Sequence, residues 1–254
     1  MPDLNQRREA PFFIGWADVP DTLRWFLIGV ALGLIILMAG LSYLVSSTQD
    51  DPGIGGFMGR AEAIGVMQAE PYPIIHVLES EIFEPGSALL LTGGGKRGVQ
   101  ARAADFDGQI VKVSGARIAR GDIAALQLRG GTNGLDSAEG PTPGLPEQVD
   151  LGRWRITGEI CDGKCYAGAM RPGQGLAHKA CANLCLIGGV PPVLVATDKI
   201  DGTEFFLLAN AEGGPVTDVI LDHVATLIEV EGQVERHGGM AVVKIDPDTL
   251  RLAQ

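Results

Sequence analysis

The chain has 254 residues, and 20 Lys and Arg residues stand against 31 Asp and Glu residues, so its formal net charge at pH 7 is −11. This acidity argues against nucleic acid as a partner, because phosphates repel a negative protein. Hydrophobic residues make up 46% of the chain, which excludes a disordered protein. The 36 glycines and 15 prolines require many turns and disfavour a mostly helical fold.

Residues 26–45 form an uninterrupted apolar run of 20 residues without a charge. A helix rises about 1.5 Å per residue, so this run extends about 30 Å, the thickness of the hydrocarbon core of a bilayer. We therefore predict one transmembrane helix at 26–45, with the lipid bilayer as its partner. Trp25, Phe26 and Tyr43 are the expected membrane anchors, since aromatic rings are enriched at the two membrane interfaces.

The basic residues around the apolar run predict its orientation. The next basic residue after the run is Arg60, whereas three arginines precede it, namely Arg7, Arg8 and Arg24. By the positive-inside rule, residues 1–25 form a cytoplasmic tail of a bacterial inner-membrane protein, and the bulk of the chain is periplasmic. A cleaved signal peptide is the alternative, but the run is long for one and residues 44–46 (LVS) form a poor cleavage site.

Two segments rich in glycine, proline and acidic residues divide the remaining chain. Residues 46–59 form a predicted tether and residues 131–152 a predicted linker. Between and after them lie two segments with the alternating apolar and polar residues of β-strands, 60–130 and 153–254. Each is predicted to be one domain.

The two β-rich segments match each other without a gap over about 40 residues. Residues 110–115 (IVKVSG) align with residues 227–232 (LIEVEG), and the same offset of 117 aligns Gly121 with Gly238 in a predicted hairpin turn. The predicted fold class is therefore mainly β. A single N-terminal transmembrane α-helix is followed by two tandem OB-like β-barrel domains.

The second domain carries about 26 residues more than the first, in an insertion at 159–190 that contains every cysteine of the chain. These are Cys161, Cys165, Cys181 and Cys185. Residues 176–186 are predicted to form a short helix. On it, His178, Cys181 and Cys185 share one face, because they are three and four residues apart.

The four cysteines support two interpretations. In an oxidising compartment an even number of cysteines predicts disulfides, and a nested pairing of Cys165 with Cys181 and of Cys161 with Cys185 would pin the insertion as a hairpin. The alternative is a copper site. Thiolates, the imidazole of His178 and the thioether of Met170 are ligands that suit Cu(I).

The cysteine pattern also resembles a known group of proteins. Gly158 to Tyr166 (GEICDGKCY) is followed by His-x-x-Cys-Ala-x-x-Cys at 178–185 and by Gly189-x-Pro191. This string is similar to small exported bacterial domains of uncharacterised function, which combine a Cys-Tyr and a His-x-x-Cys-Ala-x-x-Cys pattern with an OB-like barrel. The resemblance implies no activity. It implies that Cys165, His178, Cys181 and Cys185 are the typical set and that Cys161 is an addition.

No motif predicts a catalytic site. Residues 92–98 (TGGGKRG) resemble a phosphate-binding loop, but Leu90 and Arg97 stand where that motif needs glycine and a hydroxyl group, so a turn between strands is predicted. We therefore expect a membrane-anchored, non-enzymatic accessory or assembly subunit without a cofactor, in contact with other subunits of a respiratory or photosynthetic electron-transfer complex. The alternative function is a periplasmic copper-binding or thiol redox protein that uses Cys165, His178, Cys181 and Cys185.

Overall fold

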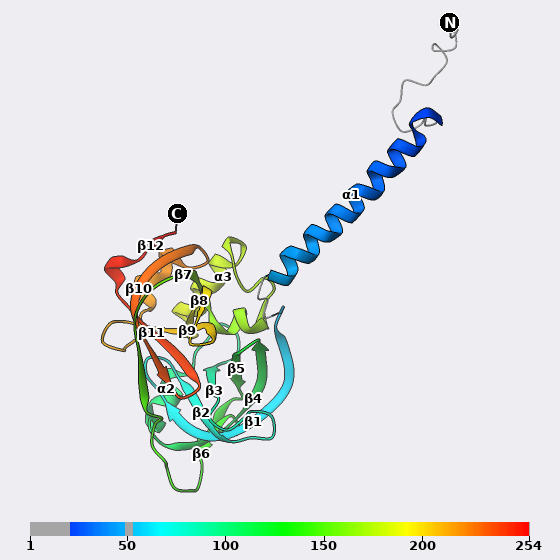
Figure 1. The fold of residues 1–254 in the computed structure, drawn as a ribbon. Coiled ribbons are helices and arrows are strands. Elements are labelled where there is room, and N and C mark those ends of the chain that lie inside the picture. Colours follow the sequence, from blue (N-terminus) through cyan, green and yellow to red (C-terminus); the bar gives the residue numbers. More distant parts are fainter. Residues whose placement is uncertain (1–20, 49–52, 254) are drawn as a thin grey trace, which may run out of the picture. The chain divides into compact units, whose positions relative to one another are not determined.

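The structure is a computed structural model that describes residues 21–48 and 53–253 (Figure 1). It is mainly β and divides into two compact units, the first ending at residue 51 and the second starting at residue 52. The first unit contains the long helix α1, and the second contains all the strands. The predicted cytoplasmic tail lies outside the described residues, apart from its last five positions.

Helix α1, Asp21–Thr48, contains the predicted run 26–45. Its segment Leu23–Val45 is long and apolar enough to cross a membrane, and none of it is buried within the protein. Trp25, Phe26 and Tyr43 are all largely exposed on it. The prediction of an N-terminal apolar helix of membrane-spanning length is therefore confirmed.

The first sheet closes into a five-stranded barrel. Its strand order is β1-β2-β3-β5-β4, and β1 also pairs with β4. The strands are β1 Gly56–Gln68, β2 Ile74–Glu79, β3 Ala88–Thr92, β4 Ile110–Arg120, β5 Ile123–Leu128 and the short outer strand β6 Leu135–Ser137. Helix α2, Gln100–Ala103, lies between β3 and β4 in the chain. The barrel begins inside the predicted tether, and β6 lies inside the predicted linker.

The second sheet repeats this pairing order. It runs β7-β8-β9-β11-β10, and β10 pairs with both β11 and β7. Its strands are β7 Gln148–Asp162, β8 Pro192–Ile200, β9 Thr203–Ala209, β10 Leu227–His237, β11 Met240–Ile245 and the outer strand β12 Arg251–Leu252. Helix α4, Thr217–Ile220, lies between β9 and β10 in the chain.

The predicted offset of 117 residues recurs in the element bounds. Strands β4 and β10 begin and end 117 residues apart, and so do β5 and β11 and the short helices α2 and α4. Val113 and Val230, which this offset aligns, are both buried, in β4 and β10. Both valines therefore lie in apolar cores, as their place in the alternation predicts.

The two sheets share one buried cluster. It draws residues from both of them, including Tyr72, Ile74, Leu90, Ile118, Val193, Phe205 and Leu207. The hydroxyl of Tyr72 accepts a hydrogen bond from the backbone N–H of Val216 at 3.0 Å. A buried polar chain also crosses between the sheets, because Gln68 bonds His76 at 2.9 Å and His237 at 3.2 Å.

The cysteine-rich insertion occupies residues 163–191, because β7 continues to Asp162 and β8 begins at Pro192. The insertion predicted at 159–190 therefore starts four residues later in the structure. It contains a π-type turn η4, Cys165–Ala169, a 3-10 turn η5, Leu176–His178, and helix α3, Lys179–Ile187. The predicted helix at 176–186 is confirmed as the continuous pair η5 and α3.

Candidate metal centre

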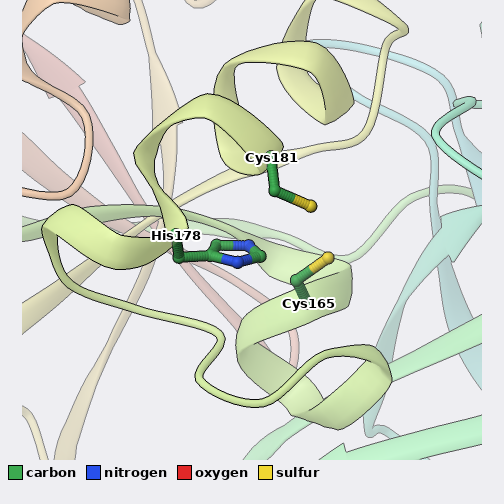
Figure 2. A group of neighbouring side chains, drawn as sticks. All are labelled: Cys165, His178 and Cys181. Carbon is green, nitrogen blue, oxygen red and sulfur yellow. The ribbon is translucent and has the colours of Figure 1, made fainter.

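Three donor side chains converge inside the insertion. One ligand atom each of Cys165, His178 and Cys181 lies within 4.8 Å of the other two, and Figure 2 shows the imidazole ring and the two sulfur atoms turned toward one another. Cys185 joins them, since its Sγ lies 3.9 Å from Sγ of Cys165. Cys165 comes from η4, whereas the other three come from the η5–α3 helical segment. The donors therefore lie on two separate parts of the insertion.

Asp162 connects this group to the second barrel. Its Oδ2 lies 3.0 Å from Nε2 of His178, and its Oδ1 accepts a hydrogen bond from the backbone N–H of Cys165 at 2.8 Å. Both the carboxylate and the imidazole are almost completely buried. A histidine that binds a metal through one ring nitrogen commonly donates the other ring N–H to a carboxylate. Asp162 is arranged for that supporting role.

Two lysines bind the insertion to the glycine-rich loop 93–98 of the first barrel. The Lys96 ammonium donates to Sγ of Cys181 at 2.5 Å and to the carbonyl oxygen of Cys181 at 3.3 Å. In the opposite direction, the ammonium of Lys164 donates to the carbonyls of Gly93 and Gly95, both at 2.7 Å. The first barrel and the insertion therefore each contribute a cation to the neighbourhood of the thiols.

These contacts shift the pKa values of two thiols and of Lys96. The hydrogen bond between the two thiols, followed by burial, raises the pKa of Cys165. The same hydrogen bond lowers the pKa of Cys185, and the positive charge of Lys96 contributes to the lowering. The hydrogen bond to Cys181 raises the pKa of Lys96, so the ammonium form beside that sulfur is favoured. The lowered pKa of Cys185 shifts its thiol toward the thiolate, which is the form of cysteine that binds a metal ion.

Cys161 does not belong to this group. It lies in β7 and is buried in the cluster that the two sheets share, where its thiol donates to Oε1 of Glu159 at 3.4 Å. Burial raises its pKa well above the ordinary value. Met170, the predicted thioether ligand, directly follows η4, and 47% of its surface is exposed. Its part in the site stays a prediction. Of the predicted copper ligands, the structure brings together Cys165, His178 and Cys181, and it places Cys185 beside Cys165.

The predicted disulfides are not formed in the structure, where all four cysteines are free thiols. The 3.9 Å between the sulfur atoms of Cys165 and Cys185 is almost twice the length of an S–S bond. The nested pairing stays a prediction for the oxidised protein.

Comparison with protein-family models, with curated proteins and with solved structures found no match for this chain.

Three residues of the site were not predicted from the sequence: Lys96, Asp162 and Lys164. Asp162 had a usable signal, because it lies between two cysteines of the pattern. Lys96 had none, since the loop that carries it reads as an ordinary turn.

Proposed function

We propose that this chain is a membrane-anchored metal-binding protein that holds one thiophilic ion between Cys165, Cys181, Cys185 and His178. The observation that carries the proposal is the convergence of Cys165, His178 and Cys181, with Asp162 behind the imidazole. Cys185 lies beside Cys165 as a further donor, with 3.9 Å between the two sulfur atoms. In a tetrahedral site with metal–sulfur bonds of about 2.3 Å, two sulfur ligands lie about 3.8 Å apart. The distance of 3.9 Å between Cys165 and Cys185 agrees with that value.

The donor set limits the ion to a soft or borderline metal. Thiolates and imidazole suit Cu(I) and Zn(II), whereas Mg²⁺ and Ca²⁺ require oxygen ligands. Cu(I) is the ion of the alternative interpretation of the sequence, and Zn(II) is its rival because three cysteines and one histidine form a known zinc ligand set. When bound, either ion would link η4 to α3 and stabilise the insertion.

Metal content of matched cysteine variants tests the proposal. The full chain, purified in detergent under argon with reductant, should bind about one equivalent of Cu(I) or Zn(II). Cys165→Ser and Cys185→Ser should each lower the affinity by at least about tenfold, and Cys161→Ser should retain it, because Cys161 lies outside the site. Equal losses in all three variants, or no bound metal in the parent chain, would contradict the proposal. If protein purified without reductant is metal-free and has two crosslinks that join Cys161 and Cys165 to Cys181 and Cys185, the predicted disulfides are supported instead.

We also propose that the chain serves as an accessory or assembly subunit of a membrane electron-transfer complex. This role is motivated by the single apolar helix, by the two β-sheet modules and by a sequence without a catalytic motif. Purification in a mild detergent tests it. A stable complex with redox-active membrane subunits is the expected result, and a chain that migrates alone after gentle extraction and crosslinking would contradict it.

We infer that the two sheets are tandem OB-like domains derived from one duplicated unit. The support is the repeated pairing order, the short helix between the third and fourth strands of each sheet, and the common offset of 117 residues.

A reporter that is active only in the periplasm, fused after Gln254, tests the proposed orientation. Activity of a cytoplasmic reporter at the same point would overturn the periplasmic assignment.

A further inference from the structure

The insertion exposes an apolar helical face on the side away from the metal donors. Along η5 and α3 the exposed residues Leu176, Ala180, Leu184 and Ile187 recur at intervals of three and four, so they form one stripe, here called the outer face of α3. Leu176 is 71% exposed, Leu184 55% and Ile187 64%. The opposite side of the same helix carries the buried residues Ala182, Cys185 and Leu186. A helix of this length with apolar residues on both sides needs a second apolar environment.

The charges around the outer face of α3 contrast with those of the rest of the β unit. Residues 46–254 carry 17 basic and 27 acidic residues, yet residues 163–191 contain three basic residues and no acidic one. Lys179 and Arg171 use their cationic groups on backbone carbonyls, those of Asp222 and Gly55. Lys164 is buried, so the surface of the insertion carries two cations, Arg171 and Lys179, and no acidic residue of its own.

The glycine-rich loop of the first barrel extends this cationic surface. Lys96 and Arg97 are exposed in it, and residues 93–98 contain no acid. The loop is fastened to the end of α3, because the backbone N–H of Gly98 donates to the carbonyl of Gly188 at 2.8 Å. The exposed apolar stripe and this pair of cations therefore belong to one rigid surface.

We propose that the outer face of α3 rests in the headgroup region of an anionic lipid bilayer. Apolar side chains on a short helix, with Lys and Arg beside them, are the features of helices that lie in a membrane interface, where apolar burial and attraction to anionic lipids add. The bilayer is also the surface most available to this chain. Only residues 49–53 separate the end of α1 from Ile54, whose carbonyl accepts a hydrogen bond from Arg120 in the β unit. Because this connection is short, the β unit meets a bilayer that holds α1 at high effective concentration.

This inference rests on the proposed membrane anchoring of α1 and does not depend on the metal. Fluorescence quenching by lipids tests it on the full chain. In a chain with Trp16, Trp25 and Trp154 replaced by Phe, Leu184→Trp reports on the outer face of α3. Leu252→Trp, on β12 and 59% exposed, is the matched control. Both are reconstituted in vesicles of phosphatidylcholine with and without phosphatidylglycerol, using lipids brominated on their acyl chains.

Brominated lipid should quench the Leu184→Trp chain at least about twofold more than the Leu252→Trp chain, and more strongly with phosphatidylglycerol present. Adding Arg97→Gln and Lys179→Gln should reduce that difference. Equal quenching at the two positions, as expected if an acidic protein partner covers this face, would overturn the proposal. A chain that keeps only Trp25 reports whether α1 is inserted, so failure of the membrane anchor is recognised separately, and the metal measurements stand on their own.

Discussion

The Lys96 ammonium nitrogen lies 2.5 Å from the sulfur of Cys181, although 85 residues separate the two in the chain. Lys96 belongs to the loop after β3 of the first barrel, and Cys181 to a helix inserted into the second. This contact places a positive charge beside one of the candidate metal ligands. The first barrel thus contributes directly to the candidate metal centre.

Neutralising Lys96 should weaken metal binding. We expect Lys96→Met to lower the metal affinity by about tenfold, which is the lower end of the loss seen when a residue that supports a metal ligand is removed. Lys96→Arg should keep most of the affinity. Competition with a chromogenic chelator measures both. Arg97→Met is the matched control, since Arg97 is exposed on the same loop and should leave the affinity unchanged. Identical affinities for the Lys96→Met chain and the parent would show that the ammonium group has no part in the site.

Replacing Asp162 by Asn keeps the shape of the side chain but removes the charge that orients His178. The hydrogen bonds at 3.0 Å to His178 and at 2.8 Å to the N–H of Cys165 both depend on this carboxylate. We expect Asp162→Asn to reduce metal affinity by about 10- to 100-fold with the β-sheet circular dichroism unchanged. Asp198→Asn, an exposed carboxylate outside the site, should have no effect. The same affinity in both variants would argue against a supporting role for Asp162.

Gly98 should be irreplaceable where the loop meets the insertion. A Cβ atom at this position would lie 1.9 Å from the carbonyl oxygen of Gly189, so Gly98→Ala must push the loop away from α3. We expect a loss of about 1–3 kcal/mol in the free energy of unfolding. Gly94→Ala, where a Cβ would meet no atom within 4 Å, is the control. Thermal unfolding in detergent compares the two, and equal midpoints would show that the loop is not held as described.

Stability of the β unit should fall as the pH is lowered below 6.5. Burial of His76, followed by the neighbouring charge of His237, lowers the pKa of His76 from 6.5 to about 4. Between these two pKa values His76 binds a proton in the unfolded chain but not in the folded chain. The folded state is therefore progressively disfavoured down to about pH 4. The full chain in detergent should therefore unfold at a lower temperature at pH 5 than at pH 7.

The variant His76→Gln separates this effect from the other titrating groups. It lacks the imidazole that gains a proton on unfolding, so its unfolding midpoint should change less between pH 5 and pH 7 than that of the parent chain. His223→Gln, at a residue in the short turn after α4, should retain the parent's pH dependence. If all three chains show the same slope, His76 is not the group responsible.

Local features of the sequence were sufficient for the long helix, for the two hairpins and for most of the donor set, but not for strand bounds, since β1 begins in the predicted tether and β6 lies in the predicted linker. Twenty consecutive apolar residues predict α1 because the bilayer sets the length of a spanning helix. Alternating residues around Gly121 and Gly238 predict both hairpins because side chains of a strand point to opposite faces in turn. The spacing of His178, Cys181 and Cys185 puts them on one helix face, which the structure confirms.

Tertiary structure alone decided which cysteines act together and what surrounds them. Cys161 and Asp162 are neighbours in the sequence, but β7 continues through both, so their side chains point in opposite directions. Cys161 therefore enters the core between the sheets, and Asp162 meets His178. Lys96 reaches Cys181 because the two barrels pack against each other. Contacts between residues 85 positions apart depend on that packing, which no local pattern of residues encodes.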